Sequence, residues 1–165
     1  MTRARPSCML RRLALPALAL LLAVSGCEAP TAPGDRDALA EARARWRAGG
    51  SLSYSYELNR SCFCLLAGRA MRVTVDAGSV VSAEYIDSRT GVEAALLTYV
   101  PTIPDLFDLA EDALDRRASY FVAEYDTTYG FPTRIDIDYS SSAADDEVAI
   151  SARNLVPGEG AAGSR

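Results

Sequence analysis

Two cysteines separated by one residue, Cys62 and Cys64 in the stretch NRSCFCLL, are the clearest candidates for chemistry in this sequence. A pair with this spacing can form a disulfide, act as a redox couple, or supply half of a tetrahedral metal site. Which of these applies depends on the compartment in which the protein resides. It depends equally on the other residues that the chain can bring to the pair.

The N-terminal segment predicts export. Residues 1–26 begin with arginines and contain an apolar stretch from Leu13 to Val24. This stretch is shorter than the about 20 residues that a membrane-spanning helix needs, so it is typical of a cleaved signal. Its end, LLAVSGC, resembles the lipobox of bacterial lipoproteins, which implies cleavage after Gly26 and lipidation of the new first residue, Cys27. The alternative is an ordinary secretory signal that is cut after a small residue.

Lipidation of Cys27 would hold the mature protein on the extracytoplasmic side of a membrane. An anchor of two or three acyl chains is stable because each buried methylene contributes about 0.8 kcal/mol. Glu28 stands where a lipoprotein retained at the inner membrane would have Asp, so in a Gram-negative envelope we expect the outer membrane, facing the periplasm. We predict a signal peptide, a tether with the lipidated cysteine, a single α+β domain and a disordered tail, over residues 1–26, 27–36, 37–156 and 157–165 respectively.

The charge balance narrows the class of partner. Residues 27–165 carry 13 basic against 22 acidic residues, which gives a net charge of −9. Such a surface repels a phosphate backbone, so nucleic acid is not an expected partner. The expected partners are the membrane, through the lipid on Cys27, and a protein of the envelope.

The sequence contains no histidine and no lysine, which restricts the reactions available to it. Histidine is the side chain with an unperturbed pKa near neutrality, and its absence removes Ser-His-Asp and Cys-His catalysis. Without lysine there is no Schiff base and no phosphate-binding loop of the G-K-[ST] type. Two-carboxylate chemistry on glycosides remains available, but no pair of carboxylates stands out. We therefore expect no enzymatic activity and no cofactor.

The remaining chain divides into helical and alternating patterns. DRDALAEARARWRAGG predicts a helix with Asp35 or Asp37 as N-cap, ending at its GG pair. Alternation of period two in SLSYSYELNR, AMRVTVD and VVSAEYI predicts three strands, with Gly78 in the turn between the last two. The stretch VEAALLTYV, residues 92–100, fits either a strand or a helical turn.

A capping box predicts a second helix. Thr102 and Asp105 have the required spacing, and Pro104 lies in the first turn, where its missing N–H costs little. Apolar residues then recur at helical spacing. They are Ile103, Leu106, Phe107, Ala110, Ala113 and Leu114.

Three further strands follow, in SYFVAEYD, TRIDIDY and EVAISARNL. The predicted order is thus α-β-β-β-α-β-β-β. Strands joined by short turns pair antiparallel, because a parallel crossover needs a dozen or more residues. We expect an α+β fold, in which an antiparallel meandering β-sheet has two helices packed on one face.

Several of these segments together resemble one family. A helix ending in Trp46, then YSYEL, the CFC pair, VTVDAGSVV, TIPDLFDLAEDAL and AEYDTTYGFPTRIDID occur in this order. The combination resembles a bacterial exported family known as domain of unknown function 6174, over most of residues 39–155. The resemblance implies a single folded module that is often lipid-anchored. It implies no activity.

Composition and compartment rank the alternatives for Cys62 and Cys64. A zinc site would need two further ligands, but the mature chain has no histidine, and the only cysteine that it has besides this pair is the lipidated Cys27. An oxidising compartment favours a disulfide. Because the Cα atoms of residues i and i+2 on an extended strand are about 6.6 Å apart, the backbone at Phe63 must bend to bring the two sulfur atoms together. A redox pair is the competing interpretation, with only Arg60 and Arg69 near in sequence to stabilise a thiolate. We expect a structural disulfide that shapes a turn.

Two groups of residues could serve binding, but each also has a purely structural explanation. The strands are rich in tyrosine, which suits a partner-binding face but also suits half-buried strands, and we adopt the second interpretation. An acidic group around the last turn supplies oxygen atoms of the kind that calcium binds. The spacing of an EF-hand is absent, however, so we expect a solvated loop. This acidic group is Asp136, Asp138, Asp145, Asp146 and Glu147.

The expected function is that of a membrane-anchored envelope lipoprotein that serves as a non-catalytic binding or scaffolding module. The alternative is a thiol-redox accessory protein that uses Cys62 and Cys64. A pair that resists reduction favours the first function, and a readily reduced pair favours the second.

Overall fold

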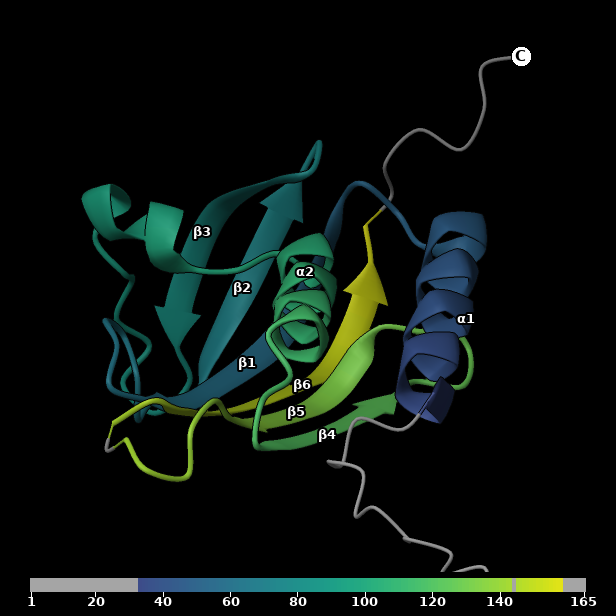
Figure 1. The fold of residues 1–165 in the computed structure, drawn as a ribbon. Coiled ribbons are helices and arrows are strands. Elements are labelled where there is room, and N and C mark those ends of the chain that lie inside the picture. Colours follow the sequence, from purple (N-terminus) through teal and green to yellow (C-terminus); the bar gives the residue numbers. More distant parts are fainter. Residues whose placement is uncertain (1–32, 144, 159–165) are drawn as a thin grey trace, which may run out of the picture.

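The computed structural model describes residues 33–143 and 145–158. Within these ranges the chain forms two α-helices, one 3₁₀ helix and six β-strands (Figure 1). In chain order they are α1 (Pro33–Gly49), β1 (Tyr54–Cys62), β2 (Met71–Asp76), β3 (Ser79–Tyr85), η1 (Ala94–Tyr99), α2 (Ile103–Asp115), β4 (Tyr120–Tyr125), β5 (Pro132–Asp138) and β6 (Glu147–Pro157).

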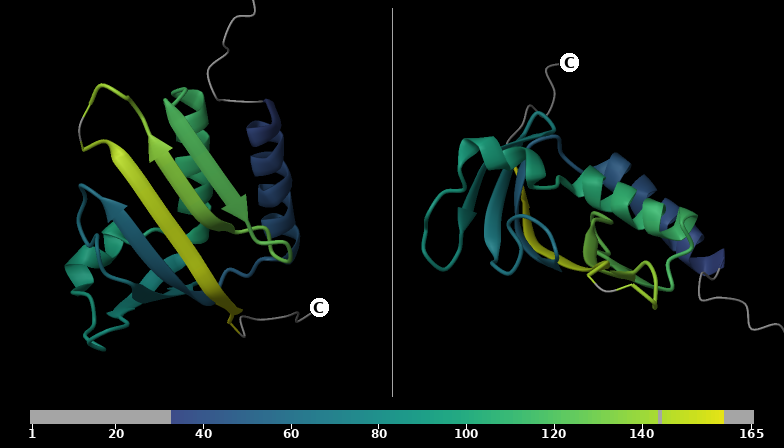
Figure 2. Two further views of the ribbon diagram at one scale, coloured as in Figure 1. Left: turned by 90° about the horizontal axis from the view of Figure 1, so that it is seen from below. Right: turned by 60° about the vertical axis from the view of Figure 1, so that its left-hand side comes forward.

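All six strands belong to one antiparallel sheet, in the order β3-β2-β1-β6-β5-β4. Strands β1 to β3 form one meander and β4 to β6 a second, and the two meanders join where β1 pairs with β6. The predicted α+β fold and its α-β-β-β-α-β-β-β order are therefore confirmed. The first and last strands are neighbours at the centre of the sheet (Figure 2).

Both helices lie on the same face of the sheet (Figures 1 and 2). Side chains of β1 alternate between the face that the helices cover and the opposite face. Tyr54, Tyr56 and Leu58 are buried in the core under the helices, while Ser55 and Glu57 lie on the opposite face. Antiparallel pairing carries this alternation across the other strands. The core therefore fills the layer between helices and sheet, and no helix of the described residues covers the opposite face.

Helix α2 begins as its capping box predicts. The Thr102 hydroxyl accepts from the Asp105 amide at 3.3 Å, and the Asp105 carboxylate accepts from the Thr102 amide at 2.7 Å. Each bond satisfies a donor that the start of a helix leaves free. The whole predicted apolar stripe is buried, namely Ile103, Leu106, Phe107, Ala110, Ala113 and Leu114.

Helix α1 begins earlier than predicted. It starts at Pro33, so neither Asp35 nor Asp37 is the N-cap, and Asp35 lies within the first turn. Proline is well tolerated there, and a carboxylate in the first turn interacts favourably with the positive end of the helix dipole. The apolar face is as expected, since Leu39, Ala42 and Trp46 are all buried.

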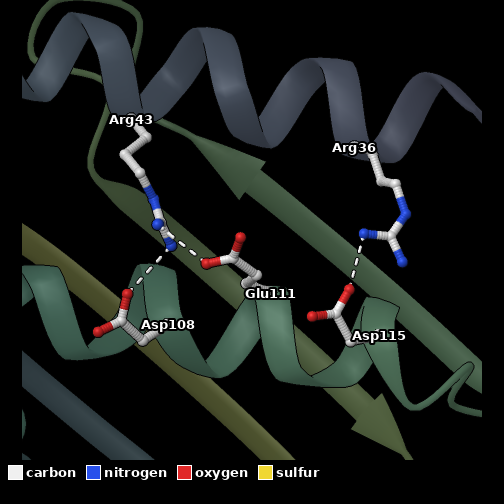
Figure 3. Close-up of polar contacts among 5 residues, drawn as sticks. All are labelled: Arg36, Arg43, Asp108, Glu111 and Asp115. Carbon is white, nitrogen blue, oxygen red and sulfur yellow. Dashed lines mark hydrogen bonds and ion pairs between the residues drawn. The ribbon is translucent and has the colours of Figure 1, made fainter.

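Arginines of α1 reach acidic residues of α2 (Figure 3). Arg43 lies between Asp108 and Glu111, at 3.1 and 2.9 Å, and Arg36 pairs with Asp115 at 2.8 Å. Exposed ion pairs contribute only about 0–1 kcal/mol each. We conclude that they orient α1 along α2 more than they stabilise the domain.

Two local features resolve details that the sequence pattern leaves open. Residues 94–99 form the 3₁₀ helix η1, so the segment 92–100 is mainly helical and contributes no strand to the sheet. Between β2 and β3, Ala77 and Gly78 both have positive φ, at 48° and 79°. Two such residues in succession are what a tight hairpin turn requires.

The domain extends slightly beyond its predicted boundaries. β6 continues to Pro157, and the Gly158 amide donates to the Ser53 carbonyl at 2.7 Å, past the boundary expected at residue 156. The predicted signal (residues 1–26), Cys27 with most of the predicted tether, and residues 159–165 of the predicted tail lie outside the described residues. Neither α1 nor α2 has the length and apolar character that crossing a membrane requires.

Candidate binding surface at the C-x-C loop

β1 ends at Cys62, and the chain turns at Phe63. The Sγ atoms of Cys62 and Cys64 lie at disulfide-bonding distance, and their Cα atoms are 5.2 Å apart instead of the about 6.6 Å of an extended strand. The backbone therefore bends between the two cysteines, as expected. Leu66 and Gly68 follow with φ values of 63° and 83°, and they return the chain toward β2.

Two hydrogen bonds close residues 62–68, which we name the C-x-C loop. The Gly68 amide donates to the Arg60 carbonyl at 2.8 Å, and the Arg60 guanidinium donates to the Leu65 carbonyl at 2.7 Å. Burial lowers the pKa of the Arg60 guanidinium. The arginine nearest to the cysteines in sequence thus supports the backbone of the loop.

The C-x-C loop exposes Phe63. Its side chain is 85% exposed, the highest value among the large hydrophobic residues of the described chain. Leu65, in the same loop, is also exposed. Exposed aromatic and aliphatic side chains that lie together are a common feature of contact surfaces. The loop therefore offers an apolar contact point at the end of β1.

A pocket of about 440 Å³ opens beside Phe63, on the face of the sheet opposite the helices. Ser61 and Ala149, which are partners in the β1–β6 register, are among its small lining residues. Phe63 and Tyr120 contribute aromatic rings. Carboxylates make up much of the remaining lining, from Asp136, Asp138, Asp145 and Glu147.

The four carboxylates differ in their partners. Asp136 pairs with Arg134, whereas Asp138, Asp145 and Glu147 form no ion pair with any residue that the structure describes. The Oδ1 atom of Asp138 is buried and has no hydrogen-bond partner there. The described residues contain no group of three or more side chains arranged to hold a metal ion. The pocket is thus an acidic surface with unused hydrogen-bond acceptors.

A second pocket, of about 350 Å³, lies beneath the C-x-C loop on the helix side of the sheet. Leu106 and Leu109 of α2 line it together with Arg60 and Asp146. Cys62 and Phe63 line both pockets. The start of the C-x-C loop therefore forms part of the wall between them.

The strand tyrosines mainly serve the core. Tyr54 accepts from the Ile103 amide at 2.9 Å, and Tyr56 donates to the Pro101 carbonyl. Burial raises the pKa of Tyr54 to about 12 and raises the pKa of Tyr56 well above its usual value. Tyr120 differs because it is exposed and lines the first pocket. Others pack partly buried against the core, namely Tyr85, Tyr125, Tyr129 and Tyr139.

The model of one protein family, described as a family of unknown function (DUF6174), matches residues 38–157. The chain belongs to the DUF6174 family. The match confirms the resemblance found in the sequence and runs from α1 to β6, so the C-x-C loop and the acidic pocket lie within the DUF6174 module. Cys27 precedes this module. The sequence matches no curated protein and no solved structure.

Sequence reasoning singles out Cys62 and Cys64 but not the aromatic residues of the DUF6174 pocket. A signal for Phe63 is nevertheless present, because the alternation of β1 buries the even positions Tyr54, Tyr56 and Leu58, and position 63 continues the odd series that lies outside the core. Tyr120 carries no comparable signal, since its place beside the pocket depends on the pairing of β4 with β5.

We predict that Cys62 and Cys64 are oxidised to each other in protein taken from its native compartment. Thiol alkylation before and after reduction, followed by mass spectrometry, should show that neither cysteine reacts before reduction. Because the closed loop is small, reduction should lower the free energy of unfolding by only roughly 1–2 kcal/mol. Alkylation of both cysteines in the unreduced, unfolded protein would contradict the prediction. The Cys62→Ser, Cys64→Ser variant is the control and should match the stability of the reduced protein.

Proposed function

We propose that this protein is a non-catalytic binding module, held at a membrane of the cell envelope by lipid on Cys27. Its contact surface is the C-x-C loop with the adjoining acidic pocket. The observation that carries the proposal is Phe63, which is 85% exposed between two cysteines at bonding distance and beside an open pocket.

The position of Phe63 favours binding for an energetic reason. Burying a phenylalanine side chain contributes about 1.5–3 kcal/mol. Association normally loses part of such a gain because loops must become ordered. A loop that is closed by the cysteine pair and by the Gly68–Arg60 hydrogen bond loses less conformational freedom on contact. Phe63 is therefore an effective anchor for a partner.

The position of the C-x-C loop suits presentation away from a membrane anchor. α1 starts at Pro33, six residues after Cys27. In Figure 1 this start lies at the lower right, whereas the loop between β1 and β2 lies at the left edge of the domain. The separation is also evident in the left view of Figure 2. A lipid on Cys27 would therefore leave the loop accessible to a partner.

The thiol-redox alternative has less physical support. Reactive cysteines are usually activated by a nearby cation or by a helix N-terminus. Here carboxylates line the pockets on both sides of the cysteine pair, and negative charge disfavours a thiolate. Arg60 binds the Leu65 carbonyl and Arg69 pairs with Asp87, so both guanidinium groups have other partners.

The anchor is tested by replacing Cys27 with serine. We expect the exported Cys27→Ser protein to leave the membrane fraction, because serine cannot accept the lipid through sulfur. Fractionation and immunoblotting measure the change. Cys8→Ser is the matched control, since it removes another cysteine of the N-terminal segment, and it should fractionate like the wild type. A Cys27→Ser protein that is exported and still tightly membrane-bound would refute lipid anchoring.

The contact surface is tested by a photo-cross-linking amino acid at position 63 in the membrane-anchored protein. We expect specific adducts from position 63 and none from position 81. Val81 is a suitable control because it is an exposed apolar residue on β3, away from the C-x-C loop. Absence of adducts at position 63, or equal adducts at both positions, would refute the proposed surface.

A further inference from the structure

We infer that the acidic pocket beside Phe63 binds a basic segment of the partner protein, with an arginine or lysine side chain inserted among its carboxylates. This inference rests on the proposed function and specifies the chemistry of the partner. Three features carry it: unpaired negative charge, exposed aromatic rings, and the shape of the surrounding sheet face.

The charge of the pocket has no counterpart within the described domain. Asp138, Asp145 and Glu147 lack ion-pair partners among the described residues. Arg134, which lines the neighbouring surface, already pairs with Asp136 and, at 3.4 Å, with Glu124. Because the buried Oδ1 of Asp138 has no hydrogen-bond partner among the described residues, nothing there offsets the charge of this carboxylate. A cationic side chain is therefore the complementary occupant.

The aromatic residues extend this complementarity. Phe63 and Tyr120 line the same pocket, and both are substantially exposed, at 85% and 48%. The face of an aromatic ring attracts a cation, and its apolar surface also packs on the aliphatic stem of arginine or lysine. A small anion would gain nothing from either ring, and the carboxylates would repel it.

The sheet face allows an extended chain to reach the pocket. An adjoining hollow of about 390 Å³ shares Ser61, Asp136 and Ala149 with the acidic pocket, so the two form one continuous trough. Asn59 and Ser151 line the far part of this trough. Because several of these side chains are small, the backbone of a partner can approach the sheet closely. An extended peptide segment therefore fits better than a helix.

The test uses amide chemical shifts of the mature protein, residues 27–165, with Cys27→Ser to keep it in solution. The probe is a short synthetic peptide in which arginine and leucine alternate, and the matched peptide has glutamate in place of each arginine. We expect the arginine peptide to shift the amides of Ser61, Phe63, Tyr120, Asp138 and Ala149. The glutamate peptide should shift none of them.

Two double variants with the same change in net charge make the test specific. Asp138→Asn with Glu147→Gln should weaken binding of the arginine peptide by about tenfold, because it removes charges that face the ligand. Asp37→Asn with Glu93→Gln changes two exposed acidic residues outside the pocket lining and should alter the affinity by less than about twofold.

The outcomes separate this inference from the proposed function. Equal weakening by both variants, or shifts spread over the whole domain, would mean non-specific attraction and would overturn the basic-segment inference. Adducts at position 63 combined with no binding of the arginine peptide would overturn the inference while supporting the contact surface. If position 63 yields no adducts, the proposed contact surface is refuted, and the basic-segment inference is refuted with it.

Discussion

Replacing Phe107 with alanine should lower the free energy of unfolding by about 3–5 kcal/mol, the usual range for a buried phenylalanine. Phe107 is 1% exposed in the layer between α2 and the sheet. Its ring stacks on Tyr125 with centroids 6.3 Å apart, and the Arg43 guanidinium lies 5.6 Å from its centroid. The alanine variant would lose these contacts and leave a cavity beneath the junction of the two helices.

Phe63→Ala is the matched control, because it removes the same side chain from an exposed position. It should change the free energy of unfolding by less than about 0.5 kcal/mol, as surface substitutions usually do. Urea denaturation followed by circular dichroism measures both variants. Similar losses for the two would mean that the assignment of core and contact surface is wrong.

The domain should lose stability steeply between about pH 10 and pH 12, because its buried tyrosines keep their phenolic protons in the folded state, whereas the unfolded chain releases them. Burial raises the pKa of Tyr54 to about 12 and that of Tyr56 well above its usual value. Above pH 10 the unfolded chain releases these phenolic protons while the folded state keeps them, so the unfolded state binds fewer protons. Each such tyrosine lowers the free energy of unfolding by about 1.4 kcal/mol per pH unit in this window.

Tyr54→Phe isolates one of these protons. Between pH 10 and pH 12 the stability of this variant should fall less steeply, by about 1.4 kcal/mol per pH unit. At neutral pH the variant should be less stable by about 1–3 kcal/mol, since the buried Ile103 amide loses the hydroxyl that accepts its hydrogen bond. Phe121→Leu is the control, because it alters a buried ring without an ionisable group and should leave the slope unchanged. An unchanged slope in Tyr54→Phe would contradict the prediction.

The elements of this fold are predictable because their signals act within a few residues. The capping box at Thr102 and Asp105 places the start of α2, and the alternation of Tyr54, Tyr56 and Leu58 predicts the buried face of β1. The start of α1 is less predictable, because two signals of similar strength compete: Pro33 favours a first turn at its own position, and Asp35 favours an N-cap two residues later. Local preferences of similar strength leave such a boundary open.

The candidate site is less predictable because it combines residues that are distant in sequence. The C-x-C spacing indicates where the chain bends, but the acidic pocket needs β1 beside β6 and β5 beside β4. No local pattern specifies that Ser61 faces Ala149, or that Tyr120 lies opposite Asp138. Such pairings follow from the order of the strands in the sheet, which is set by the packing of the whole domain.

The central pairing of β1 with β6 has a consequence for how the chain folds. Leu58 and its partner Ala152 are 94 residues apart in sequence, so the middle of the sheet closes only after nearly the whole domain is available. Pairings of such high contact order form slowly, because the entropy of closing a long loop is lost before the contacts compensate for it. Core residues come from both meanders, so neither meander alone completes the core. Under the export that we propose for this chain, such a topology would delay folding until the last strand has crossed the membrane, and the polypeptide would stay extended enough to pass.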